Sequence, residues 1–118
     1  MQVDEFFGDH LAAFRLHKAV EAAVLRIGPA EVRASRSQIS FCRRHVFAAT
    51  WMPQRYLRGK QAPLVLSIFL RHHHVSPRWK EVVEPADGRF THHLELRHVT
   101  DVDDFVRARL EEAWREGG

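Results

Sequence analysis

Apolar residues recur every three or four positions near both ends of the chain, which is the spacing of one helical face. The first stripe consists of Ala13, Leu16, Val20, Ala23, Val24 and Ile27. The second consists of Val102, Phe105, Val106, Leu110, Ala113 and Trp114. Gly28 and Pro29 follow the first stripe and are a strong stop signal, because proline cannot continue the helical hydrogen bonds. The pattern predicts one helix over about residues 9–27 and another at the C-terminal end.

Between these helices the apolar positions change to a period of two or to short continuous runs, as in β-strands. Strands are predicted over residues 38–43, 46–51, 64–72 and 90–99. The polar pair Arg44 and His45 separates the first two runs, which predicts a hairpin. The third run, LVLSIFLRH, is almost continuously apolar and therefore predicts a central strand.

Proline and glycine interrupt the remaining segments of the middle region. Residues 54–63 are expected to form a loop, and residues 75–88 an irregular connection with one helical turn. Phe6 and Phe7 are expected to fold back onto the core.

The predicted order is α-β-β-β-β-α in a single α+β domain of residues 1–118. Short connections favour a largely antiparallel four-stranded sheet, with the N- and C-terminal helices on one face. The uncovered face must then contact solvent, a ligand or a partner. It is predicted to carry Gln38, Ser40, His93, Glu95 and Arg97.

The composition is that of an ordinary globular domain, with 45% hydrophobic residues in 118 positions. Cys42 is the only cysteine, which excludes an intramolecular disulfide and a cysteine-based zinc site, and it is interpreted as an inert structural residue. The acidic start MQVDEFFGDH lacks the basic region of a secretory signal, and no apolar run approaches the roughly 20 residues of a membrane span. A cytoplasmic, non-membrane protein is expected.

The net charge is +3, and the basic residues are concentrated in the first part of the middle region. A patch of this kind is suited to an anion. It consists of Arg33, Arg36, Arg43, Arg44, Arg55, Arg58, Lys60 and Arg71. No Walker loop, dinucleotide fingerprint, nucleophile elbow, zinc-protease motif or nucleic-acid-binding signature accompanies it. The common nucleotide and hydrolase chemistries therefore have no support.

Three short clusters carry potential chemistry. His93 and Glu95 are predicted on the same strand face, where a carboxylate can orient an imidazole. The Ser76–Lys80 loop places two cations around Trp79 and suits a phosphate or carboxylate. His72 and His74 have a spacing that some zinc sites use, although a solvated strand end explains them without a metal. No metal or cofactor is predicted.

Four segments together resemble the bacterial domain of unknown function DUF5655. They are RSQISF at 36–41, FAATWMP at 47–53, SPRWKEVV at 76–83 and RFTHHLEL at 89–96. More distantly the chain resembles the YjbR-like and DUF1801 small α+β domains, which are similar to the frataxin fold. The resemblance supports a fold and supplies no catalytic residue. It implies binding candidates within those segments, namely Ser37, Gln38, Trp51, Pro53, Ser76, Arg78, Lys80, His92, His93 and Glu95.

Several functions remain open. The leading hypothesis is a non-catalytic binding module that holds an anionic small molecule or a nucleic-acid segment on the uncovered sheet face. The alternatives are a small enzyme that uses His93 with Glu95 as an acid-base pair, a frataxin-like metal-handling protein, and a homodimerising partner-binding domain.

Overall fold

The computed structural model describes all residues from 1 to 118. It contains three α-helices, six β-strands and two short 3-10 helices. Their bounds in chain order are α1 (Val3–Phe7), α2 (Leu11–Ile27), β1 (Glu31–Ala34), β2 (Ile39–Cys42), β3 (Val46–Trp51), η1 (Pro53–Arg55), β4 (Leu64–Leu70), β5 (Glu81–Ala86), β6 (Arg89–Leu96), η2 (Val99–Asp101) and α3 (Asp104–Glu116). No helix of the structure is both long and apolar enough to cross a lipid bilayer.

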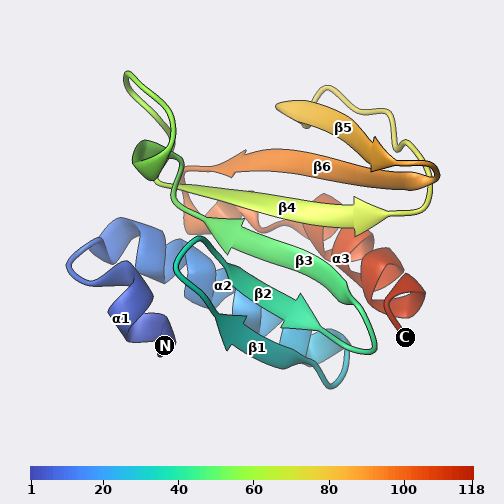
Figure 1. Ribbon diagram of the computed structural model, residues 1–118, viewed down its shortest axis with the longest axis horizontal. Helices are drawn as coiled ribbons and strands as arrows, with labels where there is room; N and C mark the ends of the chain where they lie inside the picture. The colour runs from blue at the N-terminus through green and yellow to red at the C-terminus, as the bar shows by residue number, and fades with distance from the viewer.

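The six strands form one sheet in the order β1-β2-β3-β4-β6-β5, and every neighbouring pair is antiparallel. Figure 1 shows α2 and α3 packed against the same face of this sheet. We call that face the covered face and the opposite one the open face. The predicted α+β class, the helices on one face and the central position of β4, between β3 and β6, are confirmed.

The prediction of four strands is wrong, because β1 and β5 were missed. Both are edge strands, which need hydrogen bonds along one side only and tolerate weak strand sequences. β1 has just two apolar residues, Val32 and Ala34, and its burial alternates along the strand. β5 contains Pro85, a residue that usually marks a loop but is accepted on an edge where its missing N–H is not required.

The connection at 75–88 is accordingly more regular than expected. Val82 pairs with His92 in the ladder between β5 and β6, so the segment contains a strand in place of the predicted helical turn. At the N-terminus, α2 begins at Leu11 and not at Asp9. Phe6 and Phe7 belong to the short helix α1, and both are buried as expected.

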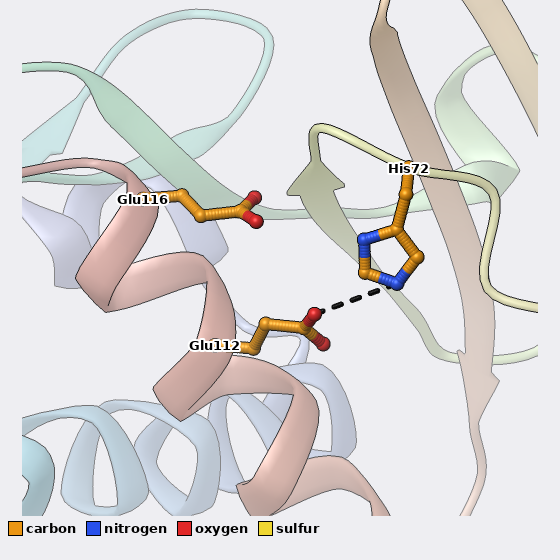
Figure 2. A group of neighbouring side chains, drawn as sticks. All are labelled: His72, Glu112 and Glu116. Atoms are coloured by element: carbon orange, nitrogen blue, oxygen red, sulfur yellow. Dashed lines mark ion pairs between the residues drawn. The ribbon is translucent and has the colours of Figure 1, made fainter.

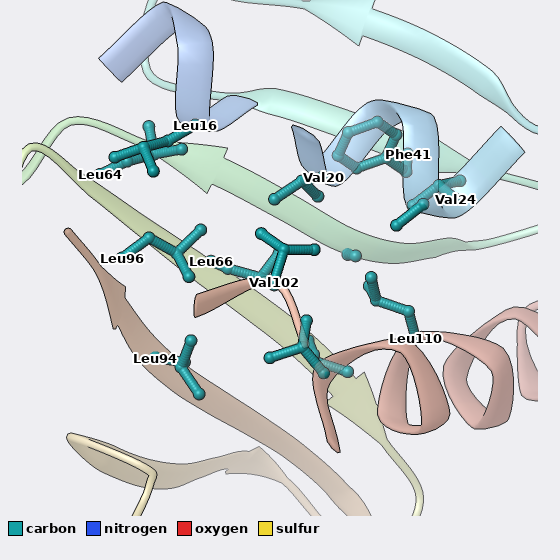
Figure 3. Close-up of a cluster of buried hydrophobic side chains, with 14 of the residues drawn as sticks. Leu16, Val20, Val24, Phe41, Leu64, Leu66, Leu94, Leu96, Val102 and Leu110 are labelled. Carbon is teal, nitrogen blue, oxygen red and sulfur yellow. The ribbon is translucent and has the colours of Figure 1, made fainter. Parts of the chain in front are cut away.

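The hydrophobic core lies between the covered face and the two long helices (Figure 3). Leu66 of β4 is opposite Thr50 of β3 and Leu94 of β6, so it lies at the middle of this layer. His17 of α2 is a buried polar residue within the core. Its Nδ1 lies 2.8 Å from the Thr50 hydroxyl, and its Nε2 lies 3.1 Å from a Glu21 carboxylate oxygen. These partners satisfy an imidazole that is otherwise removed from water.

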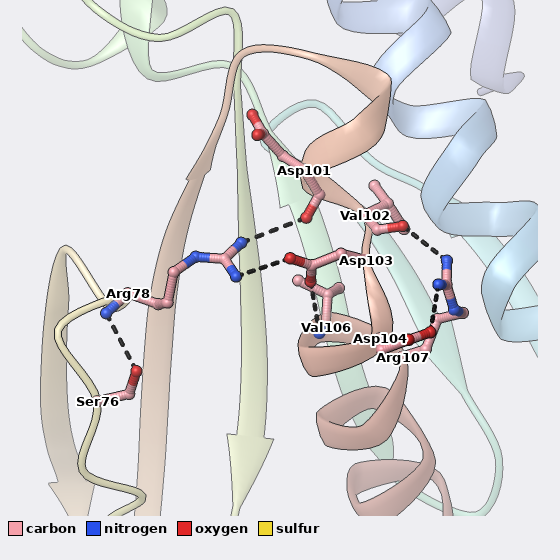
Figure 4. A network of polar contacts seen from close by, with 8 residues as sticks. All are labelled: Ser76, Arg78, Asp101, Val102, Asp103, Asp104, Val106 and Arg107. Carbon is pink, nitrogen blue, oxygen red and sulfur yellow. Dashed lines mark hydrogen bonds and ion pairs between the residues drawn. The ribbon is translucent and has the colours of Figure 1, made fainter.

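The N-terminus of α3 is capped by Asp103, whose side chain accepts a hydrogen bond from the Val106 N–H at 3.1 Å. The same carboxylate binds Arg78 at 2.9 Å, as Figure 4 shows. Although partial burial acts to raise the pKa of Asp103, these hydrogen bonds and the Arg78 charge lower it below its usual value. The cap thus joins α3 to the loop that precedes β5.

Replacing Asp103 by alanine is expected to lower the free energy of unfolding by about 1 kcal/mol, because the cap and its ion pair are lost together. Urea unfolding at pH 7 measures this change. Asp104→Ala is the matched control, since the neighbouring Asp104 side chain is solvent-exposed and pairs only with Arg107. An equal loss in both variants would contradict the capping role.

Candidate functional site

A pocket of about 300 Å³ opens on the open face of the sheet. It is formed by side chains from three adjacent strands, from the β1–β2 turn and from the segment after η1. The lining residues are Ser37, Gln38, Trp51, Tyr56, Ser67, Phe69, Thr91 and His93. Strand pairing explains the convergence, because Ser67 of β4 is directly opposite His93 of β6 and both point to the same face.

Three of the lining side chains form a hydrogen-bonded row across the pocket. The indole N–H of Trp51 donates to the Ser67 hydroxyl oxygen at 2.9 Å. The same oxygen lies 2.7 Å from Nδ1 of His93. Because an indole N–H can only donate, the serine oxygen accepts from Trp51 and its own proton is available to His93. The row fixes the orientation of the His93 ring and directs the proton of a neutral ring to Nε2.

His93 is held in its neutral form by its surroundings. Burial lowers the pKa of its imidazole below the ordinary value of 6.5, Lys80 lowers it further, and Glu81 on the neighbouring strand opposes the shift. Because burial is the largest cause, the ring carries no charge at neutral pH.

Aromatic rings form the walls of the pocket. The rings of Trp51 and His93 meet edge to face at a centroid distance of 5.8 Å, and Tyr56 lies 6.1 Å from Trp51. The Tyr56 hydroxyl donates to the Ser37 carbonyl at 3.3 Å, which ties the segment after η1 to the β1–β2 turn. The wall is therefore built from two loops as well as from the sheet.

The polar rim is held by the β1–β2 turn. The Ser35 hydroxyl accepts hydrogen bonds from the N–H groups of Ser37 and Gln38, each at 3.3 Å, which closes the turn. The Gln38 amide nitrogen donates to the Ser40 hydroxyl at 3.0 Å, so its side chain lies along the open face. Four of the predicted binding candidates, Ser37, Gln38, Trp51 and His93, thus lie together in one pocket.

The remaining candidates lie elsewhere. Arg78 turns away from the open face to the Asp103 carboxylate and the Asp101 carbonyl, and Ser76 accepts the Arg78 N–H within the same loop (Figure 4). Trp79, which lies between the two cations of the predicted binding loop, is buried in the core. The structure therefore does not bring this loop to the pocket.

His92 and Glu95 also have partners of their own. His92 is fully buried and accepts a hydrogen bond from the His74 N–H, so it is part of the core. Glu95 is on the open face with His93, but it forms ion pairs with Lys80 at 3.6 Å and Arg97 at 3.7 Å. The closest polar partner of His93 is Ser67 and not Glu95.

Two further predicted features have structural roles. Pro53 is the first residue of η1 and is buried. Cys42 is 3% exposed, and burial raises the pKa of its thiol, which agrees with the interpretation of an inert residue.

Ser67 is the pocket residue whose omission from the sequence-based prediction is most informative. It is the single polar side chain in the apolar run of β4, and a buried hydroxyl in such a run requires a hydrogen-bond partner. That requirement is the sequence signal that would have indicated a polar network on the open face. Tyr56, Phe69 and Thr91 gave no comparable signal, because their positions in the pocket depend on loop geometry and strand pairing.

Comparison with known proteins gives one family and no individual relative. The family model described as "Domain of unknown function (DUF5655)" matches residues 3–116. No curated protein and no solved structure matches the chain. The match covers nearly the whole chain and confirms the resemblance inferred from its sequence segments.

Proposed function

We propose that this chain, which belongs to the DUF5655 family, is a small-molecule binding module whose ligand occupies the open-face pocket. The observation that carries the proposal is the row of Trp51, Ser67 and His93 in a cavity with aromatic walls. Ligand sites combine apolar surface with a few fixed polar groups in this way. A cytoplasmic location remains part of the proposal, since a chain whose lone cysteine is Cys42 cannot form an intramolecular disulfide and suits a reducing compartment.

An uncharged, planar, hydrogen-bonding ring is the ligand that the lining favours. None of the eight lining residues is a lysine, arginine or acid, and the lowered pKa of His93 keeps that ring neutral. Lys80, the cation that acts on the His93 ring, is already paired with Glu95. An anion in the pocket would therefore lose its hydration without gaining a counter-charge, so we propose a neutral heterocycle in preference to the anionic ligand expected from the sequence.

The same reasoning favours a small molecule over a nucleic-acid strand. Several members of the basic patch are held by protein acceptors: Arg33 binds Glu31, Arg43 donates to a carbonyl of α3, and Arg55 donates to the Phe6 carbonyl. Binding of a nucleic-acid strand draws its affinity from cationic side chains that can exchange their counterions for phosphates, and these arginines already have protein partners.

Hydrolysis with Ser67 as nucleophile is a second candidate, favoured by the 2.7 Å contact between Ser67 and His93. It is the weaker one, because Ser67 is only 3% exposed and its oxygen already accepts the Trp51 N–H. A substrate carbonyl would have to reach a buried oxygen at the floor of the pocket.

The proposal is tested by titrating ¹⁵N-labelled protein with adenine, hypoxanthine, uracil and nicotinamide and following the tryptophan indole N–H signals. At least one of these compounds is expected to shift the Trp51 signal, because that N–H lies at the pocket. The indole groups of Trp79 and Trp114 donate to His74 and to the Pro29 carbonyl. Their signals are expected to stay in place and serve as internal controls.

Trp51→Phe is expected to weaken the best of these compounds by up to about tenfold in isothermal titration, because it removes the indole N–H and part of a stacking surface whose full loss costs about 1–3 kcal/mol. Trp114→Phe is the matched control and should leave the affinity unchanged. The proposal fails if none of the four compounds moves the Trp51 signal at millimolar concentration. Salt-sensitive shifts with an oligonucleotide would instead favour nucleic-acid binding. Labelling of Ser67 by a fluorophosphonate would favour hydrolysis with Ser67 as the nucleophile.

A further inference from the structure

A group of three metal-ligating side chains lies outside the open-face pocket, between α3 and the end of β4. His72, Glu112 and Glu116 each present a nitrogen or oxygen atom within 4.8 Å of the others. Figure 2 shows the imidazole and both carboxylates pointing into the same gap. We propose that these residues bind a zinc-type divalent cation, independently of the function assigned to the open-face pocket.

The sequence brings the three residues together in a simple way. Glu112 and Glu116 are four positions apart on α3, so they lie one above the other on the same side of the helix. His72 is two residues beyond the end of β4, a strand that packs against α3 in the core. The arrangement therefore depends on the packing of α3 against β4.

Neighbouring groups orient both carboxylates before any cation is bound. The Arg71 backbone N–H donates to Glu116 Oε1 at 2.9 Å, and the Arg71 guanidinium donates to the Glu116 carbonyl at 2.8 Å. On Glu112, Nε of Arg109 lies 3.3 Å from Oε1, whereas Nε2 of His72 lies 3.4 Å from Oε2. Glu116 is thus held by a hydrogen bond to one oxygen, and Glu112 is ion-paired with Arg109 through the oxygen that His72 does not face. Surrounding groups orient metal ligands in a similar way in known sites.

The position of the acids on the helix favours a cation in this gap. Both glutamates are in the C-terminal part of α3, where the unpaired carbonyl groups already give the helix end a partial negative charge. Two carboxylates at this end are unfavourable unless positive charge is brought to them. Arg109 beside Glu112 and Arg71 at the Glu116 carbonyl offset part of that charge, and a divalent ion between the three ligands would offset the rest.

The donor set selects the type of ion. One imidazole with two carboxylates suits zinc and its neighbours in the first transition row, whereas magnesium prefers oxygen ligands alone. Three protein ligands leave a coordination position free for water or a small molecule. That position has space beside it, because Glu116 also lines a cavity of about 590 Å³ between the ends of β3, β4 and β6 and the end of α3.

Isothermal titration of tag-free protein with zinc chloride tests the proposal. One tight site per chain is expected, and His72→Ala and Glu112→Gln are each expected to weaken it at least about tenfold, since loss even of a group that orients a ligand costs about 10–100-fold. His73→Ala is the matched control, because His73 stacks on Phe90 and is not part of the cluster. It should leave the affinity unchanged.

Thermal unfolding of the same four proteins without zinc keeps the test independent of folding. Similar melting temperatures together with the expected loss of zinc affinity would support the site. The proposal is overturned if wild-type protein binds no zinc below millimolar concentration. It is also overturned if His72→Ala binds as tightly as His73→Ala, which would assign the affinity to the other histidines.

Discussion

Lowering the pH from 7 to 5 is expected to reduce the free energy of unfolding, because buried histidines resist protonation in the folded protein. His17 and His92 both have 0% exposed surface. Burial is the largest cause that lowers the pKa of each imidazole below the ordinary value of 6.5. Urea unfolding curves recorded between pH 7 and pH 5 measure the effect.

The sign follows from which state binds the proton. Below pH 6.5 the unfolded chain protonates both histidines, whereas the folded chain holds them neutral until the pH reaches their lowered pKa values. Each proton that only the unfolded state accepts costs about 1.4 kcal/mol of stability per pH unit. Stability is therefore complete above about pH 6.5 and declines as the pH falls. The Glu21 carboxylate raises the pKa of His17 and Lys18 lowers it, so Glu21 reduces the His17 share without reversing it.

Acidic groups do not obscure this window. Hydrogen bonds from the N–H groups of Arg97 and His98 lower the pKa of Asp101 from an ordinary value of 3.8, so its contribution is lost only at still lower pH. The matched variant combines His17→Phe with Thr50→Val, which replaces both partners of a buried hydrogen bond by apolar groups and keeps the core filled. It should remove the His17 share of the decline and leave the shares of His74, His92 and His93, whose pKa values burial also lowers. A stability that is flat from pH 7 to pH 5 would contradict the prediction.

The parts of the fold that could be predicted from the sequence are the elements whose own hydrophobic periodicity is strong. The stripes of α2 and α3 and the run of β4 are covered by many apolar neighbours, so their periodicity is clear. β1 and β5 bury little, and Pro85 resembles a loop residue until its neighbours are known. Edge strands are defined by the strand beside them, which is information that a local pattern does not contain.

The candidate site was likewise predictable within one strand but not between strands. Alternation along β6 correctly placed His93 and Glu95 on the face away from the helices. Alternation along one strand, however, cannot indicate which residue faces His93 from the next strand, and the partner is Ser67 and not Glu95. Arg78 was misleading for a similar reason, because its partner Asp103 is 25 positions away in the sequence. Pairs formed across elements require the register, and the register appears only in the structure.

Replacing Leu66 by alanine is expected to lower the free energy of unfolding by about 2–5 kcal/mol, a large share of the stability of a domain of this size. Leu66 is fully buried at the centre of β4, between the ladders to β3 and β6. Deleting its side chain leaves a cavity in the layer of buried side chains that Figure 3 shows. Urea unfolding at pH 7 measures the loss, and Leu11→Ala, whose side chain is 62% exposed on α2, should change stability by less than about 0.5 kcal/mol.

The open-face pocket gives this prediction a second readout. Ser67 follows Leu66 on β4 and points to the opposite face, so the strand that centres the core also carries the middle of the Trp51, Ser67 and His93 row. Because the row is held by the ladders and not by the helices, Leu66→Ala is expected to broaden or shift the Trp51 indole signal at urea concentrations where the wild-type signal is unchanged. A loss below 1 kcal/mol, with that signal unaffected, would show that the covered face does not support the pocket.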